Sequence, residues 1–341
     1  MKKSLMTLGV LALFVLMAYG QEKKFALYSV AFYNMENLFD TIHDEGKNDY
    51  EYLPNGTNQW NTMKYKAKLK NMSEILSLLS TDKLPMGPAI IGVSEIENYR
   101  VLEDILKQPA LADRGYQYVH YEGEDQRGVD CAFFYNPKLF ELTNSKLVPY
   151  VYINDTVHKT RGFLIASGNI ADEKMQFIVN HWPSRAAASP ARERAGEQVR
   201  AIKDSLLRED SAAKIVIMGD MNDDPMDKSM AVALGAKRKP VDAGPTDLYN
   251  PWWDTLKKGY GTLMYKGKWN LFDQIVFTGN LLGTDRSTLK FYKHEIFSRD
   301  FMFQKEGKYK GYPKRTQAGG VWLNGYSDHL PTIIYLIKEV K

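Results

Sequence analysis

The sequence has 341 residues, with 45 Lys and Arg against 41 Asp and Glu, which gives a formal charge of +4. A charge so close to neutral does not identify a class of binding partner, although it leaves room for a local basic groove. The single cysteine, Cys131, excludes an internal disulfide, so the fold must rest on its hydrophobic core.

Residues 1–20 have the pattern of a secretory signal peptide. Lys2 and Lys3 precede the apolar run Leu8–Met17, and Ala18-Tyr19-Gly20 resembles a small-residue cleavage site. The run is too short to span a bilayer comfortably, and no later stretch is long and apolar enough to do so. We therefore expect a protein exported to the periplasm or the extracellular space, with no stable membrane insertion after cleavage. An uncleaved N-terminal anchor is the alternative.

Residues 21–341 show no internal repeat, no low-complexity tract and no convincing linker. Removing residues 1–20 takes away two lysines and no acids, which lowers the formal charge from +4 to +2. About 320 residues is more than most single domains have, but large sandwiches reach this size as one unit. We expect one domain over residues 21–341, and a monomer.

In chain order, the first apolar stretches predict strands and a covering helix. Phe25–Tyr33 has the apolar and aromatic content of a strand and is followed directly by Asn34. Lys64–Ser80 places apolar residues at helical spacing with lysines on the other face, which predicts a helix that covers a sheet. Pro88–Val93 predicts a buried strand, and Glu95 follows it. The next expected elements are a helix at Val101–Leu111 and strands at Tyr116–Tyr121, Val129–Tyr135, Leu147–Tyr152 and Gly162–Ser167.

The second half of the chain continues with strands that meet polar residues. Met175–Asn180 predicts a strand that leads into His181. Ile215–Met218 is a short apolar run typical of a buried strand, and Gly219 follows it. Alternation along this strand places Asp220 and Asn222 on the same side. The remaining expected elements are helices at Ala191–Arg208 and Asp227–Leu234, a strand at Leu271–Phe277 that contains Asp273, and a last strand at Thr332–Ile337 preceded by Asp328-His329.

The spacing of these elements favours an α/β layered sandwich over a strict alternation of strands and helices. Polar clusters recur at the ends of separate apolar strands, and ligand sites gather at strand ends in such folds. Carboxylates whose neighbouring ligand groups are oxygens and amides suit Mg²⁺, Mn²⁺ or Ca²⁺ better than zinc. Two histidines beside a hard cation fit acid–base work in phosphoester cleavage. The clustered residues are Asn34, Glu95, His181, Asp220, Asn222, Asp273, Asp328 and His329.

Seven motifs follow one another in an order that resembles the endonuclease/exonuclease/phosphatase superfamily, which includes the DNase I-like nucleases. The resemblance spans about residues 26–338. It implies two mixed β-sheets packed face to face with helices outside, in a single catalytic domain. The motifs are Tyr33-Asn34, Ser94-Glu95, Arg127-Gly128-Val129-Asp130, Asn180-His181-Trp182, Gly219-Asp220-Met221-Asn222, Phe272-Asp273-Gln274 and Ser327-Asp328-His329.

The resemblance also implies roles for the metal and phosphate ligands. Glu95 would be the principal ligand of Mg²⁺, with Mn²⁺ or Ca²⁺ as alternatives. Asn34 and Asp328 would lie close to the same ion. Asp220 and Asn222 would line the phosphate and orient the attacking water.

The two motif histidines take complementary roles under the same resemblance. His329 would be the general base or a phosphate contact, held by Asp273. His181 would be its counterpart on the leaving-group side, and Asp130 is the candidate to orient it.

Several residues keep two interpretations. Arg127, Arg161 and Arg185 are candidates for phosphate binding, with a structural role as the alternative for each. Trp252-Trp253 is either a stacking platform for bases or part of the packing. We expect the four histidines outside the motifs to be surface or structural residues; they are His43, His120, His158 and His294.

The sequence therefore predicts a secreted, metal-dependent phosphodiesterase acting on DNA or RNA. The segment His181–Arg200 resembles that of bacterial extracellular nucleases of the superfamily. The first alternative is the same chemistry on another substrate, by a sphingomyelinase-like lipid phosphodiesterase or a phosphatase of inositol or sugar phosphates. An inactive phosphate-binding protein is the second. An exposed apolar hairpin would favour lipid, and a basic groove would favour nucleic acid.

Overall fold

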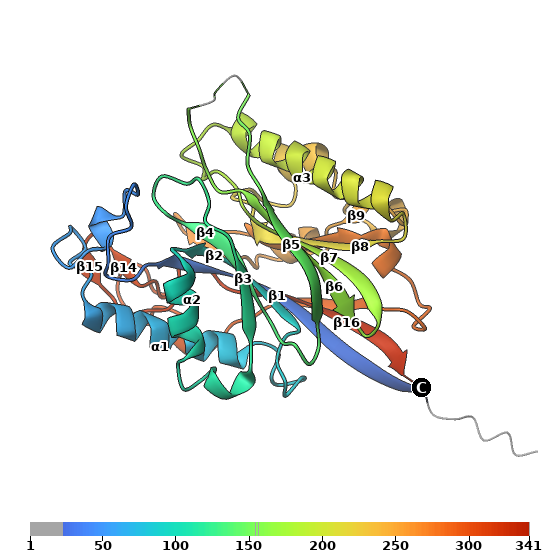
Figure 1. Ribbon diagram of the computed structural model, residues 1–341, viewed down its shortest axis with the longest axis horizontal. Coiled ribbons are helices and arrows are strands. Elements are labelled where there is room, and N and C mark those ends of the chain that lie inside the picture. The colour runs from blue at the N-terminus through green and yellow to red at the C-terminus, as the bar shows by residue number, and fades with distance from the viewer. Residues whose placement is uncertain (1–22, 154, 156, 341) are drawn as a thin grey trace, which may run out of the picture.

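The computed structural model describes residues 23–153, 155 and 157–340. Two six-stranded sheets pack face to face, and helices cover their outer faces (Figure 1). This arrangement confirms the predicted layered sandwich of two mixed sheets. The predicted signal peptide lies outside the described residues. Among the residues described, no helix is long and apolar enough to cross a membrane.

The first sheet has the strand order β13-β16-β1-β2-β4-β3. Strands β1 and β2 run parallel, and the other neighbours pair antiparallel. The bounds are β1 (Lys24–Leu38), β2 (Ile90–Ile96), β3 (Gln117–His120), β4 (Asp130–Tyr135), β13 (Lys290–Ile296) and β16 (Thr332–Val340).

The second sheet has the order β5-β6-β7-β8-β12-β9, with β7 and β8 parallel. Its strand β5 departs from the sequence prediction, which placed a strand at Leu147–Tyr152. Strand β5 lies at the edge of the sheet and is largely exposed, so its sequence lacks the apolar run that marks a buried strand. The bounds are β5 (Glu141–Val148), β6 (Phe163–Ile170), β7 (Glu173–His181), β8 (Lys214–Asp220), β9 (Leu248–Tyr249) and β12 (Asp273–Thr278).

Helices lie on both outer faces of the sandwich (Figure 1). Helices α1 (Thr62–Leu78) and α2 (Tyr99–Leu106) pack on the first sheet, and α3 (Ser189–Glu209) packs on the second. Asn98 begins α2 as its N-cap, accepting hydrogen bonds from the backbone of Arg100 and Val101. The short helices are α4 (Trp253–Lys257), 3₁₀ turns at Tyr50–Tyr52, Ala112–Arg114, Pro240–Asp242, Gly279–Leu281 and Asp300–Met302, and a π-helical turn at Ser229–Leu234.

The apolar core lies in three layers, one between the sheets and one under each set of helices. Trp252 belongs to the layer between the sheets, where it is fully buried and donates to the carbonyl of Ile275 at 2.9 Å. It is therefore a packing residue rather than a stacking platform. Two small hairpins complete the fold, β10 (Leu263–Tyr265) with β11 (Lys268–Asn270), and β14 (Gln317–Ala318) with β15 (Val321–Trp322).

Candidate active site

The site lies at the ends of the strands, just beyond the apolar side chains that fill the core between the sheets. Side chains of a strand face alternate sides, so the residue two positions beyond an inward apolar residue also faces inward. Phe32, Val179 and Met218 are inward residues of β1, β7 and β8. Two positions beyond each of them come Asn34, His181 and Asp220, and Asp273 stands two positions before the inward Ile275 of β12. All four polar residues are buried.

Strand register brings these residues to one place. The parallel pairing of β7 with β8 sets His181 beside Asp220, and the antiparallel pairing of β8 with β12 sets Asp273 on the other side of Asp220. On the first sheet, Asn34 pairs with Ser94, the residue before Glu95. Both sheets therefore contribute polar groups at the same edge of the sandwich.

Glu95 reaches the site because β2 has a bulge. Val93 and Ile96 both pack in the layer under α1 and α2, although simple alternation would place them on opposite faces. One residue between them is extra, and Glu95 takes a left-handed φ of 57° there, where the register of β2 against β4 shifts. Such a backbone conformation is costly for a residue with a side chain and is often kept at functional sites.

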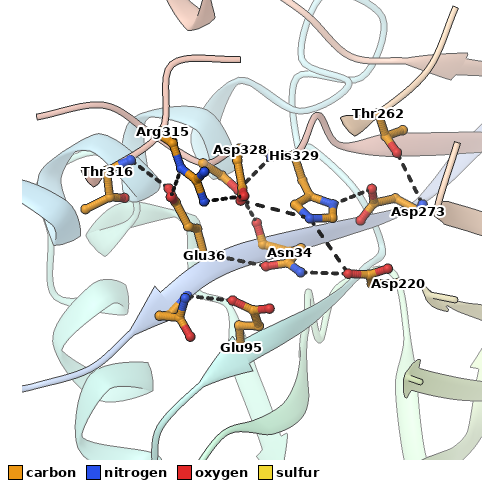
Figure 2. Close-up of polar contacts among 12 residues, drawn as sticks. Asn34, Glu36, Glu95, Asp220, Thr262, Asp273, Arg315, Thr316, Asp328 and His329 are labelled. Carbon is orange, nitrogen blue, oxygen red and sulfur yellow. Dashed lines mark hydrogen bonds and ion pairs between the residues drawn. The ribbon is translucent and has the colours of Figure 1, made fainter. Parts of the chain in front are cut away.

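Asp220 contacts polar residues from several parts of the chain, and Figure 2 shows its contacts with Asn34 and His329. Its Oδ2 accepts a hydrogen bond from Asn34 Nδ2 at 3.0 Å. The Nε2 atoms of His181 and His329 each lie 3.8 Å from the same oxygen. Asp273 fixes the other side of the His329 ring, because Nδ1 of His329 lies 2.7 Å from Oδ2 of the fully buried Asp273. One carboxylate thus faces two imidazoles that come from different parts of the chain.

The environments of these groups separate their pKa values. Burial raises the pKa of Asp220 to about 7, against the opposing attraction of His329. Burial also opposes the charged form of His329, but the carboxylates of Asp273 and Asp220 outweigh it and raise the pKa of His329 well above its usual value. Burial, together with Arg161 and other cations nearby, holds the pKa of His181 well below its usual value. One histidine is therefore charged and the other neutral at neutral pH, a separation typical of acid–base sites.

The predicted metal ligands face the same space. Glu95 Oε2 accepts from the backbone of Asn37 at 3.0 Å, and its Oε1 lies 3.6 Å from His181 Nε2. Asn34 Oδ1 accepts from the backbone of Glu36 at 2.8 Å. Asp328 Oδ1 lies 3.9 Å from His329 Nε2. These side-chain oxygens form the donor set that a hard divalent cation prefers.

Asp273, outside the predicted ligand set, has a carboxylate oxygen that could accept a further contact. Oδ1 of Asp273 is buried and lacks a hydrogen-bond partner among the described residues. Asp273 also belongs to a group, with Asp220 and His329, whose possible ligand atoms all lie within 4.8 Å of one another. The residues present therefore fit a cation, and the choice of Glu95, Asn34 and Asp328 as its ligands stays a prediction.

Glu36 and its partners belong to the site and were missed by sequence reasoning. Glu36 follows Asn34 by two residues on β1, so alternation could have placed both on one side. Burial, and the nearby Asp328, raise the pKa of Glu36 to about 7. Its two oxygens accept from Arg315 Nε at 3.0 Å and from the backbone of Thr316 at 2.6 Å (Figure 2).

Two cations close this side of the site. Arg315 also donates to Asp328 Oδ2 at 2.7 Å and so links it to Glu36. Lys68, on α1, is completely buried, with its Nζ 3.9 Å from Glu36 Oε2. The sequence placed the lysines of this helix on its solvent side, and Lys68 is an exception to that prediction. Arg315 lies in a loop that carries no motif, so nothing in the sequence marks it.

The candidate phosphate ligands are tied to the backbone around the site. Asn222, with a left-handed φ of 51°, donates to the carbonyl of Trp182 at 3.0 Å. Arg161 donates to the same carbonyl at 2.8 Å and to Asp125 at 3.0 Å. These bonds fix the loop that follows His181.

The other two arginines lie nearer the surface. Arg185 donates to the carbonyl of Asn222 at 3.1 Å and to Asp227 at 2.8 Å, so it is engaged in the acidic turn after β8. Arg127 is half exposed, with its Nε 3.7 Å from Asp125. Of the three predicted phosphate-binding arginines, Arg127 is the one whose side chain is most exposed.

The prediction that Asp130 orients His181 is wrong on geometry. On β4, Cys131 and Phe133 face the inter-sheet core and Ala132 faces the helices, so Asp130 also faces away from the site. Its Oδ2 lies 3.2 Å from Nε2 of His120. Nδ1 of His181 has no hydrogen-bond partner in the part of the chain that the structure describes.

The sequence and the fold both resemble those of known proteins. The sequence matches the model of the Endonuclease/Exonuclease/phosphatase family over residues 29–338. No curated protein is matched by the sequence.

Several solved structures share the fold. D. rerio TDP2 complexed with a single-strand DNA product is 14% identical over 91% of this chain and 99% of its own, with a TM-score of 0.55. A mannosyl-6-phosphatase of Bacteroides thetaiotaomicron is 15% identical over 91% and 99%, with a TM-score of 0.55. The human Nocturnin catalytic domain, with a bound sulfate anion, is 14% identical over 93% and 98%, with a TM-score of 0.52. At these identities the likeness shows the fold alone.

Proposed function

The chain belongs to the endonuclease/exonuclease/phosphatase family of metal-dependent phosphoester hydrolases, and we propose that it is an exported phosphodiesterase that cleaves DNA or RNA. The observation that carries the chemistry is the buried Asp220, with a pKa of about 7, between a neutral and a charged histidine. A base whose pKa lies near the working pH is the most effective one.

We assign proton transfer to Asp220. Its Oδ2 takes a proton from a water molecule as the water oxygen forms a bond to phosphorus. Asn34 Nδ2, at 3.0 Å, holds that carboxylate in place. The ester P–O bond breaks on the opposite side of phosphorus, and the leaving oxygen takes a proton from solvent. The products are a phosphate monoester and an alcohol, so atoms and charges balance.

His329 acts as a cation rather than as a base. Its raised pKa keeps the imidazolium charged, and Asp273 fixes the ring so that Nε2 faces the cluster. A preorganised positive charge stabilises the negative charge that develops on the phosphoryl oxygens in the transition state. Between general base and phosphate contact, the two expected roles of His329, the geometry favours the phosphate contact.

A divalent cation would be held by Glu95 with Asn34 and Asp328. When bound, it supplies charge neutralisation on the phosphoryl group and a lower pKa for water. Magnesium is the ion that we propose, since oxygen ligands of carboxylate and amide type suit it. Burial, together with nearby cations, keeps His181 neutral, so we do not assign it the expected role on the leaving-group side. We assign it to positioning Glu95 and Asp220, which its Nε2 faces from the second sheet.

Nucleic acid is the substrate class that the surroundings favour. The hairpin β10–β11 next to the site carries Tyr265 and Lys266 at its tip rather than a purely aliphatic surface. A mixed aromatic and cationic tip suits a polyanion with planar bases better than a lipid tail. A phosphatase of sugar phosphates is the second candidate, because the mannosyl-6-phosphatase shares the fold over nearly its whole length.

Export is supported by the pattern of residues 1–20. Expression of the full chain with fractionation of the cells tests it. Mature protein in the periplasm or medium, with an N-terminus near residue 21, is the expected result. A full-length protein retained in the cytoplasm would contradict the proposal.

A substrate panel tests the function. Plasmid DNA, RNA, sphingomyelin, inositol phosphates and mannose 6-phosphate should be incubated with Mg²⁺, with Mn²⁺ and with EDTA. We expect cleavage of nucleic acid that requires a divalent cation and is lost in His181→Ala and His329→Ala. His158→Ala is the control, because His158 is exposed and bonded to its loop neighbour Asp155.

The panel tests the mechanism and the substrate class separately. Activity that persists in EDTA, or in both active-site variants, would refute the mechanism. Intact DNA and RNA beside a cleaved lipid or sugar phosphate would refute the substrate class while leaving the chemistry in place.

A further inference from the structure

A cavity of about 740 Å³ opens directly beside the catalytic cluster. Asp328 and Arg315 line one side of it, and both belong to the network around Glu36. The hairpin β10–β11 forms one wall, and its Leu263 pairs with His329 through an isolated β-bridge. The cavity therefore lies where the part of a substrate next to the phosphate would be placed.

A hairpin-like loop, residues 302–314, forms another part of the lining. Its two arms are joined by backbone hydrogen bonds, from Gln304 to the carbonyl of Tyr312 at 2.8 Å and from Lys314 to the carbonyl of Met302 at 2.7 Å. The hydroxyl of Tyr312 accepts from the backbone of Gly267, at the tip of β10–β11, at 2.6 Å. This hydrogen bond joins the two segments of the lining to each other.

Each segment presents an exposed tyrosine with a lysine beside it. Tyr265 is 62% exposed and Tyr309 is 52% exposed. Lys266 Nζ lies 5.2 Å from the ring centre of Tyr265, and Lys308 Nζ lies 5.5 Å from that of Tyr309. Both tyrosines line the cavity, so a ligand in the cavity can reach both rings.

A neighbouring cavity shares part of this lining. A second cavity of about 390 Å³ extends from Arg315 to Glu36 and Trp60, and Tyr309 lines both cavities. A chain-like substrate could therefore pass on both sides of Arg315. This continuity suits a polymer better than a compact sugar phosphate.

We propose that the larger cavity binds the base of the nucleotide next to the scissile phosphate, by stacking on Tyr309 and Tyr265, while Lys266 and Lys308 bind neighbouring phosphates. The inference rests on the proposed nuclease function and names how that substrate is held. Aromatic rings give a sequence-tolerant platform because every base has a flat face, and lysines attract the backbone. An acyl chain would leave the lysines unpaired, and a sugar would lack a face broad enough to cover both rings.

The first test combines a protein variant with a substrate variant. Wild type and Tyr309→Ala are assayed on two oligonucleotides that differ only in whether the nucleotide beside the cleaved bond carries a base. On the base-containing oligonucleotide, we expect Tyr309→Ala to raise KM about 5- to 100-fold with little change in kcat. On the abasic oligonucleotide, the variant and wild type should have equal KM, because the stacking partner is already missing.

Two further variants separate stacking from a structural effect. Tyr309→Phe keeps the ring and should restore the KM of wild type. Tyr292→Ala is the matched control, since Tyr292 has the same 52% exposure, also has a cation near its ring, and lies on β13 away from both cavities. An equal rise in KM on both oligonucleotides, or the same rise in Tyr292→Ala, would overturn the proposal.

A binding measurement decides the inference even if the proposed function fails. Calorimetric titration of wild type and Tyr309→Ala with AMP and with ribose 5-phosphate compares ligands with and without a base. We expect wild type to prefer AMP at least about fivefold and the variant to lose that preference. Equal affinities in wild type would refute the base subsite, whereas absent cleavage of both oligonucleotides would refute the nuclease function alone.

Discussion

Replacing Asp273 with asparagine removes one negative charge from the site while keeping the shape of the side chain. Asp273 is fully buried, and its Oδ2 lies 2.7 Å from Nδ1 of His329. The amide oxygen of an asparagine can still accept a hydrogen bond from this ring nitrogen. The variant therefore tests whether the charge of His329, rather than its position alone, supports catalysis.

The size of the effect follows from the separation of the two groups. At 2.7 Å and an effective dielectric constant of about 20, a carboxylate attracts an imidazolium by about 6 kcal/mol. The cost of burying both charges offsets part of that attraction. Removing one partner of a buried ion pair therefore costs about 3–5 kcal/mol of stability. Without the carboxylate, burial dominates and the pKa of His329 falls, so the ring is neutral at neutral pH. Losing one charged contact to the transition state lowers kcat about 10²- to 10³-fold.

The assay is the ratio of kcat for Asp273→Asn to kcat for wild type, on the best substrate of the panel, between about pH 5.5 and about pH 8.5. The ratio should rise as the pH falls, because acid restores the imidazolium in the variant. Losing the Asp273 charge and losing the His329 charge shift the pKa of Asp220 in opposite directions, so the ratio mainly reports the imidazolium. A ratio near one, or a low ratio that does not change with pH, would refute the role of the His329 charge.

Three other predictions concern stability and the metal. Glu173 accepts hydrogen bonds from lysines of β8 and β16, which lower its pKa despite burial. Its contribution to the free energy of unfolding is fully present above the unfolded pKa of about 4.3. That contribution is lost as the pH falls through the lower pKa of Glu173 in the folded protein. Glu173→Gln should therefore lower the free energy of unfolding by about 1–3 kcal/mol at pH 7, with kcat unchanged, and urea titrations should show the difference narrowing in acid. Lys68→Met removes one of the two cations beside Glu36, while Arg315 stays paired with it, and should cost about 1–3 kcal/mol of stability in thermal unfolding; a variant as stable as wild type would contradict this account. Glu95→Gln should raise the Mg²⁺ concentration for half-maximal activity at least about tenfold, and an unchanged value would remove Glu95 from the metal ligands.

The grouping of the buried polar residues could be predicted because it follows the period of the strands. Asn34, His181 and Asp220 come two positions after inward apolar residues, so the same alternation that builds the core also points them into the site. The motif order then supplied Glu95 and His329. The bulge that lets Glu95 reach the cluster left no mark in the sequence, because its cost is backbone strain and not a change of residue type.

The misses have physical reasons as well. Asp130 was assigned from its place after Arg-Gly, but the alternation of β4 turns it to the other face of the sheet. Lys68 looks like any lysine on an amphipathic helix, and its burial depends on an acid from β1 and on a loop far away in the chain. Arg315 belongs to that loop, whose path is set by tertiary contacts. Sequence periodicity describes faces of single elements and does not describe contacts made across them.

The carboxylates of the site come from both halves of the sandwich. Glu36 and Glu95 stand on the first sheet, and Asp220 and Asp273 stand on the second. Like charges repel one another across the boundary between the sheets, and a cation held by Glu95, Asn34 and Asp328 would reduce that repulsion. At a concentration 100 times its Kd, such an ion adds about 2.7 kcal/mol to the free energy of unfolding. The melting temperature therefore measures how much of the cation site is occupied, without any substrate present.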